Sequence, residues 1–105
     1  MKAMRERLSN RRISTNFDFE LCGLRYTCSY SRFPDGRPAE IFLQNHKPGS
    51  QSDANARESA IAASLALQYG TPLEVLRKAI LRNADDSAST PLGKALDIIG
   101  GDDEL

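Results

Sequence analysis

The chain has 105 residues, of which 40% are hydrophobic and 27% charged, and its 14 basic and 14 acidic side chains give a formal net charge of zero. This length allows one domain, and it excludes a complete radical enzyme, dinucleotide-binding enzyme or kinase, whose scaffolds need at least roughly 200 residues. The sequence contains neither a run of about 18 apolar residues nor the apolar core of a signal peptide, which predicts a cytoplasmic protein without a membrane span.

Charge is distributed unevenly along the chain. The acidic residues Asp102, Asp103 and Glu104 close it, whereas basic residues crowd the start: Lys2, Arg5, Arg7, Arg11 and Arg12. We therefore predict a basic arm over residues 1–15, disordered or helical, a domain over 16–100 and an acidic tail over 101–105. A basic arm attracts phosphate or an acidic partner, and the alternative is a frayed, solvated terminus.

Three segments have the alternation of half-buried strands. Apolar and polar residues alternate over 17–21, over 24–31 and over 39–43, with turn residues at Gly23 and at Pro34-Asp35-Gly36 between them. This order predicts a three-stranded antiparallel meander. Phe33 and Phe42 share the parity of the outward positions, so we predict that they form an apolar patch and an interface on the outer face.

Helical signals follow the strands. Ser50-x-x-Asp53 has the form of a capping box, and the helix predicted over 54–69 carries an alanine-rich stripe with Ile61 and Leu65 beside it. We expect this helix to be central and largely buried. Gly70 ends this helix, Thr71-Pro72 begins a second, and Thr90-Pro91 begins a third that ends at Gly100-Gly101. The sequence therefore predicts an α+β fold, β-β-β-α-α-α, with three helices packed on one face of the sheet.

Few residues carry reactive chemistry. Two cysteines, Cys22 and Cys28, and the single histidine, His46, cannot fill a structural zinc site. The cysteines are predicted to be small, partly buried thiols on neighbouring β positions, and His46 a solvated loop side chain. No nucleophile elbow or glycine-rich phosphate loop occurs, so we predict no catalytic, cofactor-binding or metal-ligating residue.

The segment from 32 to 50 offers a candidate anion or partner site. It consists of the cationic side chains and the helix-capping serine of this segment: Arg32, Arg37, Lys47 and Ser50. Unpaired N–H donors and the positive end of a helix dipole favour phosphate at such a place. The alternative is helix capping. The Asp53 carboxylate can accept hydrogen bonds from the same N–H donors, in which case the loop only stabilises the start of the helix and binds no anion.

Three separated blocks resemble the TSCPD domain: GLRYTCSYSRFPDGRPAEIFL, GSQSDANARESAIAASLALQYGTPLEVLR and TPLGKALD. This domain lies near the C-terminus of vitamin B12-dependent (class II) ribonucleotide reductases and is also found in short stand-alone proteins. The resemblance covers roughly residues 17–97. In the long enzymes it implies a barrel that reduces ribonucleotides with adenosylcobalamin. This sequence lacks that barrel, the Thr-Ser-Cys-Pro-Asp motif and the clustered cysteines. The resemblance therefore implies membership of the ribonucleoside-diphosphate reductase family, but it implies neither reductase activity nor a cofactor for this chain.

Two functions follow as expectations. The resemblance implies an accessory or regulatory module for ribonucleotide reduction, whose partner is a reductase subunit or a second copy of the chain. The alternative is a nucleic-acid-binding module with a double-stranded-RNA-binding layout. Against it, the stretch from Ser50 to Glu58 carries two acids and the lone Arg57, which leaves only the arm from Lys2 to Arg12 as a basic footprint.

Overall fold

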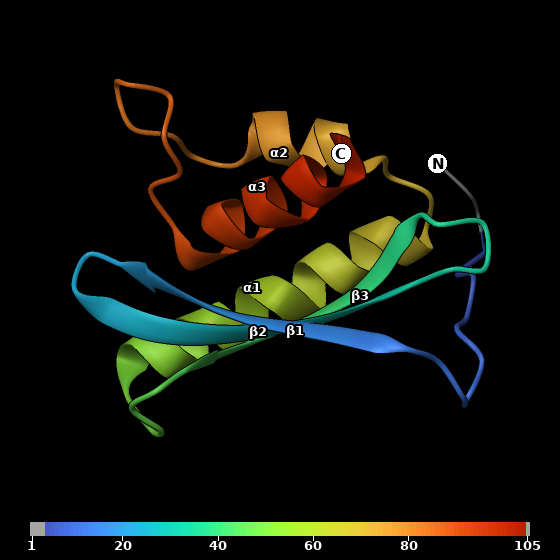
Figure 1. The fold of residues 1–105 in the computed structure, drawn as a ribbon, viewed down its shortest axis with the longest axis horizontal. Helices are drawn as coiled ribbons and strands as arrows, with labels where there is room; N and C mark the ends of the chain where they lie inside the picture. Colours follow the sequence, from blue (N-terminus) through green and yellow to red (C-terminus); the bar gives the residue numbers. More distant parts are fainter. Residues whose placement is uncertain (1–3, 105) are drawn as a thin grey trace.

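A computed structural model describes residues 4–104 and confirms the α+β class. Its elements are arranged in the order predicted, three strands and then three helices (Figure 1): β1 Ser14–Leu21, β2 Leu24–Arg32, β3 Pro38–Asn45, α1 Gln51–Gln68, α2 Leu73–Ala79 and α3 Pro91–Glu104. The N-cap of α2 is Pro72, without a side-chain cap, rather than the predicted Thr71.

The strands form an antiparallel sheet in the order β1-β2-β3. Cys22 and Gly23 connect the first two strands with positive φ angles of 53° and 78°, the conformation of a type I′ hairpin turn. The register places Phe17 opposite Cys28 and Cys28 opposite Leu43, so that these three side chains share one face of the sheet. Apolar side chains of all three strands therefore line one inner face.

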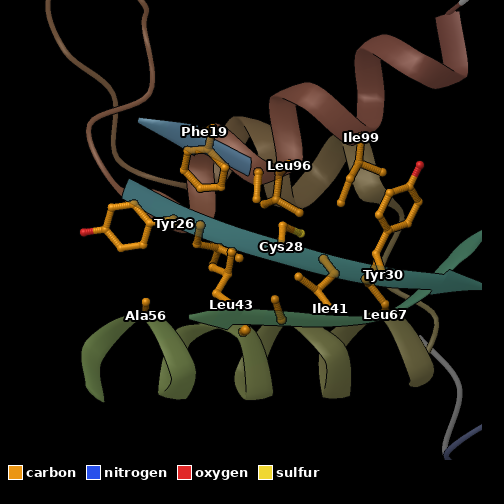
Figure 2. Close-up of a cluster of buried hydrophobic side chains, with 14 residues drawn as sticks. Phe19, Tyr26, Cys28, Tyr30, Ile41, Leu43, Ala56, Leu67, Leu96 and Ile99 are labelled. Carbon is orange, nitrogen blue, oxygen red and sulfur yellow. The ribbon is translucent and has the colours of Figure 1, made fainter. Parts of the chain in front are cut away.

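The core lies between this inner face and the helices. Cys28, Leu96 and Ile99 are each 0% exposed, and Figure 2 shows Leu96 and Ile99 of α3 pointing toward β2. The predicted alanine-rich stripe of α1 joins the same cluster through Ala56, Ala60, Ala63 and Leu67. One hydrophobic core thus joins side chains of the sheet, α1 and α3.

Helix α1 runs alongside β3 and satisfies the backbone of that edge strand (Figure 1). Ser64 Oγ accepts a hydrogen bond from Ile41 N at 2.8 Å and donates to Ile41 O at 3.0 Å. Gln68 Nε2 donates to Ala39 O at 3.0 Å, and Asp53 Oδ1 accepts from Asn45 N at 3.0 Å. The helix takes the place that a fourth strand would have, which prevents further pairing there.

This position corrects the prediction that α1 is central and largely buried with Ile61 and Leu65 next to its buried stripe. Ile61 is 58% and Leu65 40% exposed. Because α1 lies at the sheet edge, only its alanine stripe contacts the core, and its other side faces solvent.

Helices α2 and α3 are joined by an ion network around Asp97. Arg82 Nη2 and Nη1 lie 2.7 Å and 2.8 Å from the two carboxylate oxygens of Asp97, and Arg77 Nε lies 3.2 Å from Oδ1. The Arg82 guanidinium, assisted by Arg77, holds the pKa of Asp97 below its ordinary value. The fork-like geometry of arginine makes this a specific junction.

Helix α3 continues through Gly100-Gly101 to Glu104, so the predicted end of this helix is wrong. A Cβ atom on Gly100 would overlap Arg77 Nη1 and lie 2.7 Å from Arg77 Cζ. Glycine at this position therefore makes room for the Arg77 side chain rather than ending the helix.

Residues 4–13 have no helix or strand and contact the domain at several points. Arg12 Nη2 lies 2.8 Å from Glu40 Oε1, and Glu6 Oε1 lies 3.1 Å from Arg37 Nη2. Arg5 donates a hydrogen bond to the Gln68 side chain. Several charges of the predicted basic arm are thus engaged by the domain itself; Lys2 lies outside the described residues.

Candidate functional site

An exposed apolar patch spans the outer face of β3 and the neighbouring side of α1. It consists of Phe42, 56% exposed, with Ile61, 58%, and Leu65, 40%, and we refer to it as the Phe42 patch. A hollow of about 390 Å³ adjoins it, lined by Phe42 and Ile61 together with Thr27, Ser29, Leu43, Gln44 and Arg57. Large apolar side chains that cluster beside a hollow are typical of a protein-binding surface.

Cations border the Phe42 patch. Arg57 lines the first hollow, and Arg5 lines a second one of about 280 Å³ that also includes Ile61 and Leu65. Arg57 is held by Asp53, whose Oδ2 lies 3.1 Å from Arg57 Nε. An apolar centre with arginines at its rim fits a partner with an apolar anchor and nearby acidic groups.

Phe33, predicted to lie beside Phe42, is only 3% exposed. The register of β2 and β3 shifts between Ser31 and Arg32, and such a bulge reverses the side to which the following residues point. The Arg37 guanidinium also lies over the Phe33 ring, 4.7 Å from its centre. The prediction of an outward Phe33 is therefore wrong, and Phe42 alone occupies the predicted face.

The four predicted anion-site residues do not come together. Arg32 and Arg37 lie at the β2–β3 turn, where Arg32 Nη1 donates to Gly36 O at 2.8 Å and Arg37 Nε donates to Asp35 Oδ2 at 2.7 Å. Lys47 and Ser50 follow β3 at its opposite end. Because β3 separates the two pairs, a single anion site of all four residues does not form.

The predicted capping role of Ser50 is confirmed. Ser50 Oγ accepts a hydrogen bond from Asp53 N at 3.1 Å and donates to Lys47 O at 2.8 Å. Asp53 turns its carboxylate to Asn45 N instead of completing a reciprocal capping box. The Asn45 N–H, assisted by Arg57, holds the pKa of Asp53 below its ordinary value. The loop that precedes α1 holds its own helix and ties it to β3.

The two cysteines differ from the prediction that they occupy neighbouring, partly buried β positions. Cys22 is exposed in the hairpin turn, and Cys28 is 0% exposed in the centre of β2. Burial raises the pKa of the Cys28 thiol to about 12. The four strand steps from Leu24 to Cys28 alone span about 13 Å, which is beyond the reach of a disulfide.

A cluster of polar side chains on the outer face of the sheet was not predicted from the sequence. His46 Nε2 and Asp18 Oδ1 each lie 2.7 Å from Thr27 Oγ1. The strand register could have indicated Asp18, since it is paired with Thr27, but His46 lies just beyond the end of β3. All three side chains are solvent-accessible and Asp18 bonds to the hydroxyl rather than to the imidazole, so the cluster lacks the orientation of a catalytic triad.

Among the side chains of residues 4–101, no group of three or more His, Cys, Asp or Glu could hold a metal ion. In this part of the chain, no helix is both long and apolar enough to cross a membrane.

The fold is thus a small α+β module that carries an exposed apolar patch on β3 and α1. Part of this chain is similar to three vitamin B12-dependent ribonucleotide reductases. The one from Rhodopirellula baltica is 39% identical over 75 residues, 71% of this chain and 7% of that enzyme. Those from Agrobacterium fabrum and Bradyrhizobium diazoefficiens are 43% and 36% identical over 70 residues, 67% of this chain and 6% of each enzyme.

These relatives show that one region of the B12-dependent reductase is related to this chain. The chain spans only 6–7% of the length of the curated relatives that it matches. No family model matches the chain, and no solved structure matches it.

Proposed function

We propose that this chain is a TSCPD-type accessory module that docks on a B12-dependent ribonucleotide reductase in the cytoplasm and regulates it. The observation that carries the proposal is the 36–43% identity to reductases over about 70 residues. The chain supplies a binding surface, and the radical chemistry with its cobalamin belongs to the partner.

The Phe42 patch is the docking surface in this proposal. Its three apolar side chains are 40–58% exposed, and they line hollows in the surface. Burial of a phenylalanine against a partner contributes roughly 1.5–3 kcal/mol, and a central aromatic side chain surrounded by a polar rim is typical of a binding hot spot.

The nucleic-acid alternative is not favoured. The start of α1 carries the buried carboxylate of Asp53, and its Arg57 is paired with that carboxylate. Residues 4–13 form no helix, unlike the layout expected for a double-stranded-RNA-binding module. Arg12 is paired with Glu40, which lowers the charge available for phosphate contacts.

A titration of the purified B12-dependent reductase from the same cells with this chain tests the proposal. We expect saturable binding by the wild type and at least about tenfold weaker binding by Phe42→Ala, because the substitution removes the anchor of the patch. Phe42 is 56% exposed, so the variant should unfold at nearly the same urea concentration as the wild type.

Val75→Ala is the matched control, because Val75 is 53% exposed on α2, outside the patch. It should bind the reductase as tightly as the wild type does. Equal affinities for wild type and Phe42→Ala would exclude the patch as the docking surface, and failure of the wild type to bind the reductase would contradict the proposed function.

A further inference from the structure

The two edges of the sheet differ in their protection. Three polar side chains of α1 occupy the backbone groups along β3. The opposite edge is β1, whose residues Ser14, Asn16, Asp18 and Glu20 are exposed. The fold thus covers one edge and leaves the other accessible.

The hydrogen-bond pattern shows which groups of β1 face outward. Ile41 gives both of its backbone groups to Ser64, so its pairing with Tyr30 is a non-hydrogen-bonded pair. Antiparallel pairs alternate, and Cys28 therefore exchanges its backbone hydrogen bonds with Phe17. It follows that the even-numbered residues of β1 direct their N–H and C=O groups toward the open edge.

This edge has few of the features that usually block strand pairing: its exposed charges are Asp18 and Glu20, and both form ion pairs with Arg25 of β2. Between Ser14 and Leu21 the chain has no proline, no lysine and no shift in the register with β2. Ile13, directly before β1, is 89% exposed. The edge is eight residues long, which suits it to pair with another strand.

We propose that the β1 edge is a self-association surface, at which two copies pair β1 with β1 antiparallel about a two-fold axis through Phe17. Asn16 then lies opposite Asp18 of the second copy, and Ser14 opposite Glu20. The two sheets join into one continuous sheet, and Ile13 is covered by Leu21 of the second copy. A two-fold contact of this kind satisfies the same groups on both copies.

Charge and strand length together set the register. An axis through Asp18 would oppose two aspartates, and one through Phe19 would oppose Asp18 and Glu20, both of which are destabilising. Axes through Phe17 and Asn16 both avoid this, but the axis through Phe17 pairs residues 14–20 of β1, whereas the one through Asn16 pairs only residues 14–18. The Phe42 patch lies on β3 and α1, so this inference is independent of the proposed function.

Sedimentation of the full chain over roughly a hundredfold range of concentration tests the inference. The wild type should pass from monomer to dimer, whereas Asn16→Pro, which removes an outward N–H without touching the ladder to β2, should weaken dimerisation by about tenfold or more. Asn16→Ala is the matched control, because it keeps the N–H group and should dimerise as the wild type does.

Charge variants test the register without affecting folding of the edge. Asn16→Lys places a cation opposite Asp18 of the second copy and should tighten the dimer by a few-fold, and Asn16→Asp should weaken it by a similar factor. A wild type that remains monomeric throughout overturns the inference and leaves the edge to a strand of another protein. Dimerisation that is unchanged by Asn16→Pro, in a variant shown to be folded, overturns it as well.

Discussion

At the scale of single residues, burial decides the chemistry of this protein. Asp53 is 5% exposed and accepts hydrogen bonds from Asn45 N and Arg57 Nε, so its charge is compensated within the fold. Burial also distinguishes the two thiols in their accessibility, because Cys22 is exposed and Cys28 is buried. The sequence indicated which residue types were present, but their accessibility depends on the register of β2.

Thiol labelling should distinguish the two cysteines. A thiol-reactive reagent at about pH 8 should label only Cys22 in the native protein, because burial raises the pKa of Cys28 to about 12 and blocks access to its sulfur. Both thiols should react in denaturant. In the control Cys22→Ser the native protein should not react, and native labelling of Cys28 at the rate of Cys22 would contradict the buried position.

At the scale of elements, the strands and helix starts were predictable because each has a local cause. Alternation indicated the strands, and the capping serine and Gly70, with its positive φ of 100°, mark the two ends of α1. The end of α3 was missed because Gly100 has its role in a contact with Arg77, 23 residues earlier in the chain. The prediction that Phe33 points outward was wrong for a related reason, because the alternation of apolar and polar residues does not indicate where a β-bulge occurs.

Ser64→Ala should loosen the attachment of α1 to β3. The variant leaves Ile41 N and Ile41 O without the partner that satisfies both, and we expect it to lower the free energy of unfolding by about 1–3 kcal/mol. Urea denaturation checks the value. Ser59→Ala is the control, since Ser59 Oγ bonds only within its own helix, to Ala56 O; equal losses in both variants would argue against a special role of Ser64.

Asp97→Asn should destabilise the junction of α2 and α3 in a pH-dependent manner. The folded pKa of Asp97 is lowered, principally by Arg82, so its stabilisation is complete above the unfolded value of about 3.9 and is lost as the pH falls through the folded value. We expect a loss of about 1–3 kcal/mol at neutral pH that shrinks below about pH 4.

Denaturation of wild type and variant across this pH range measures the effect. Asp86→Asn is the control, because the Asp86 side chain is 91% exposed and lies 3.9 Å from Arg82, so its loss should change stability little. A difference between wild type and Asp97→Asn that stays constant down to the lowest pH would contradict the assignment.

At the scale of the whole molecule, the arrangement of layers was predictable and the candidate site only in part. The order of elements indicated an α+β fold, and parity correctly placed Phe42 outward. The rest of the Phe42 patch comes from Ile61 and Leu65, which are exposed because α1 lies along the edge of β3. That placement depends on side-chain hydrogen bonds between distant residues, a tertiary effect that local patterns do not contain.

We propose that the chain acts on a B12-dependent reductase through the Phe42 patch. The most direct test is the rate of ribonucleotide reduction by that purified enzyme as this chain, or its Phe42→Ala variant, is added in increasing amounts. We predict a saturable change in rate with the wild type and little change with Phe42→Ala at the same concentrations. Rates that remain identical with and without saturating wild-type chain would exclude this proposed function.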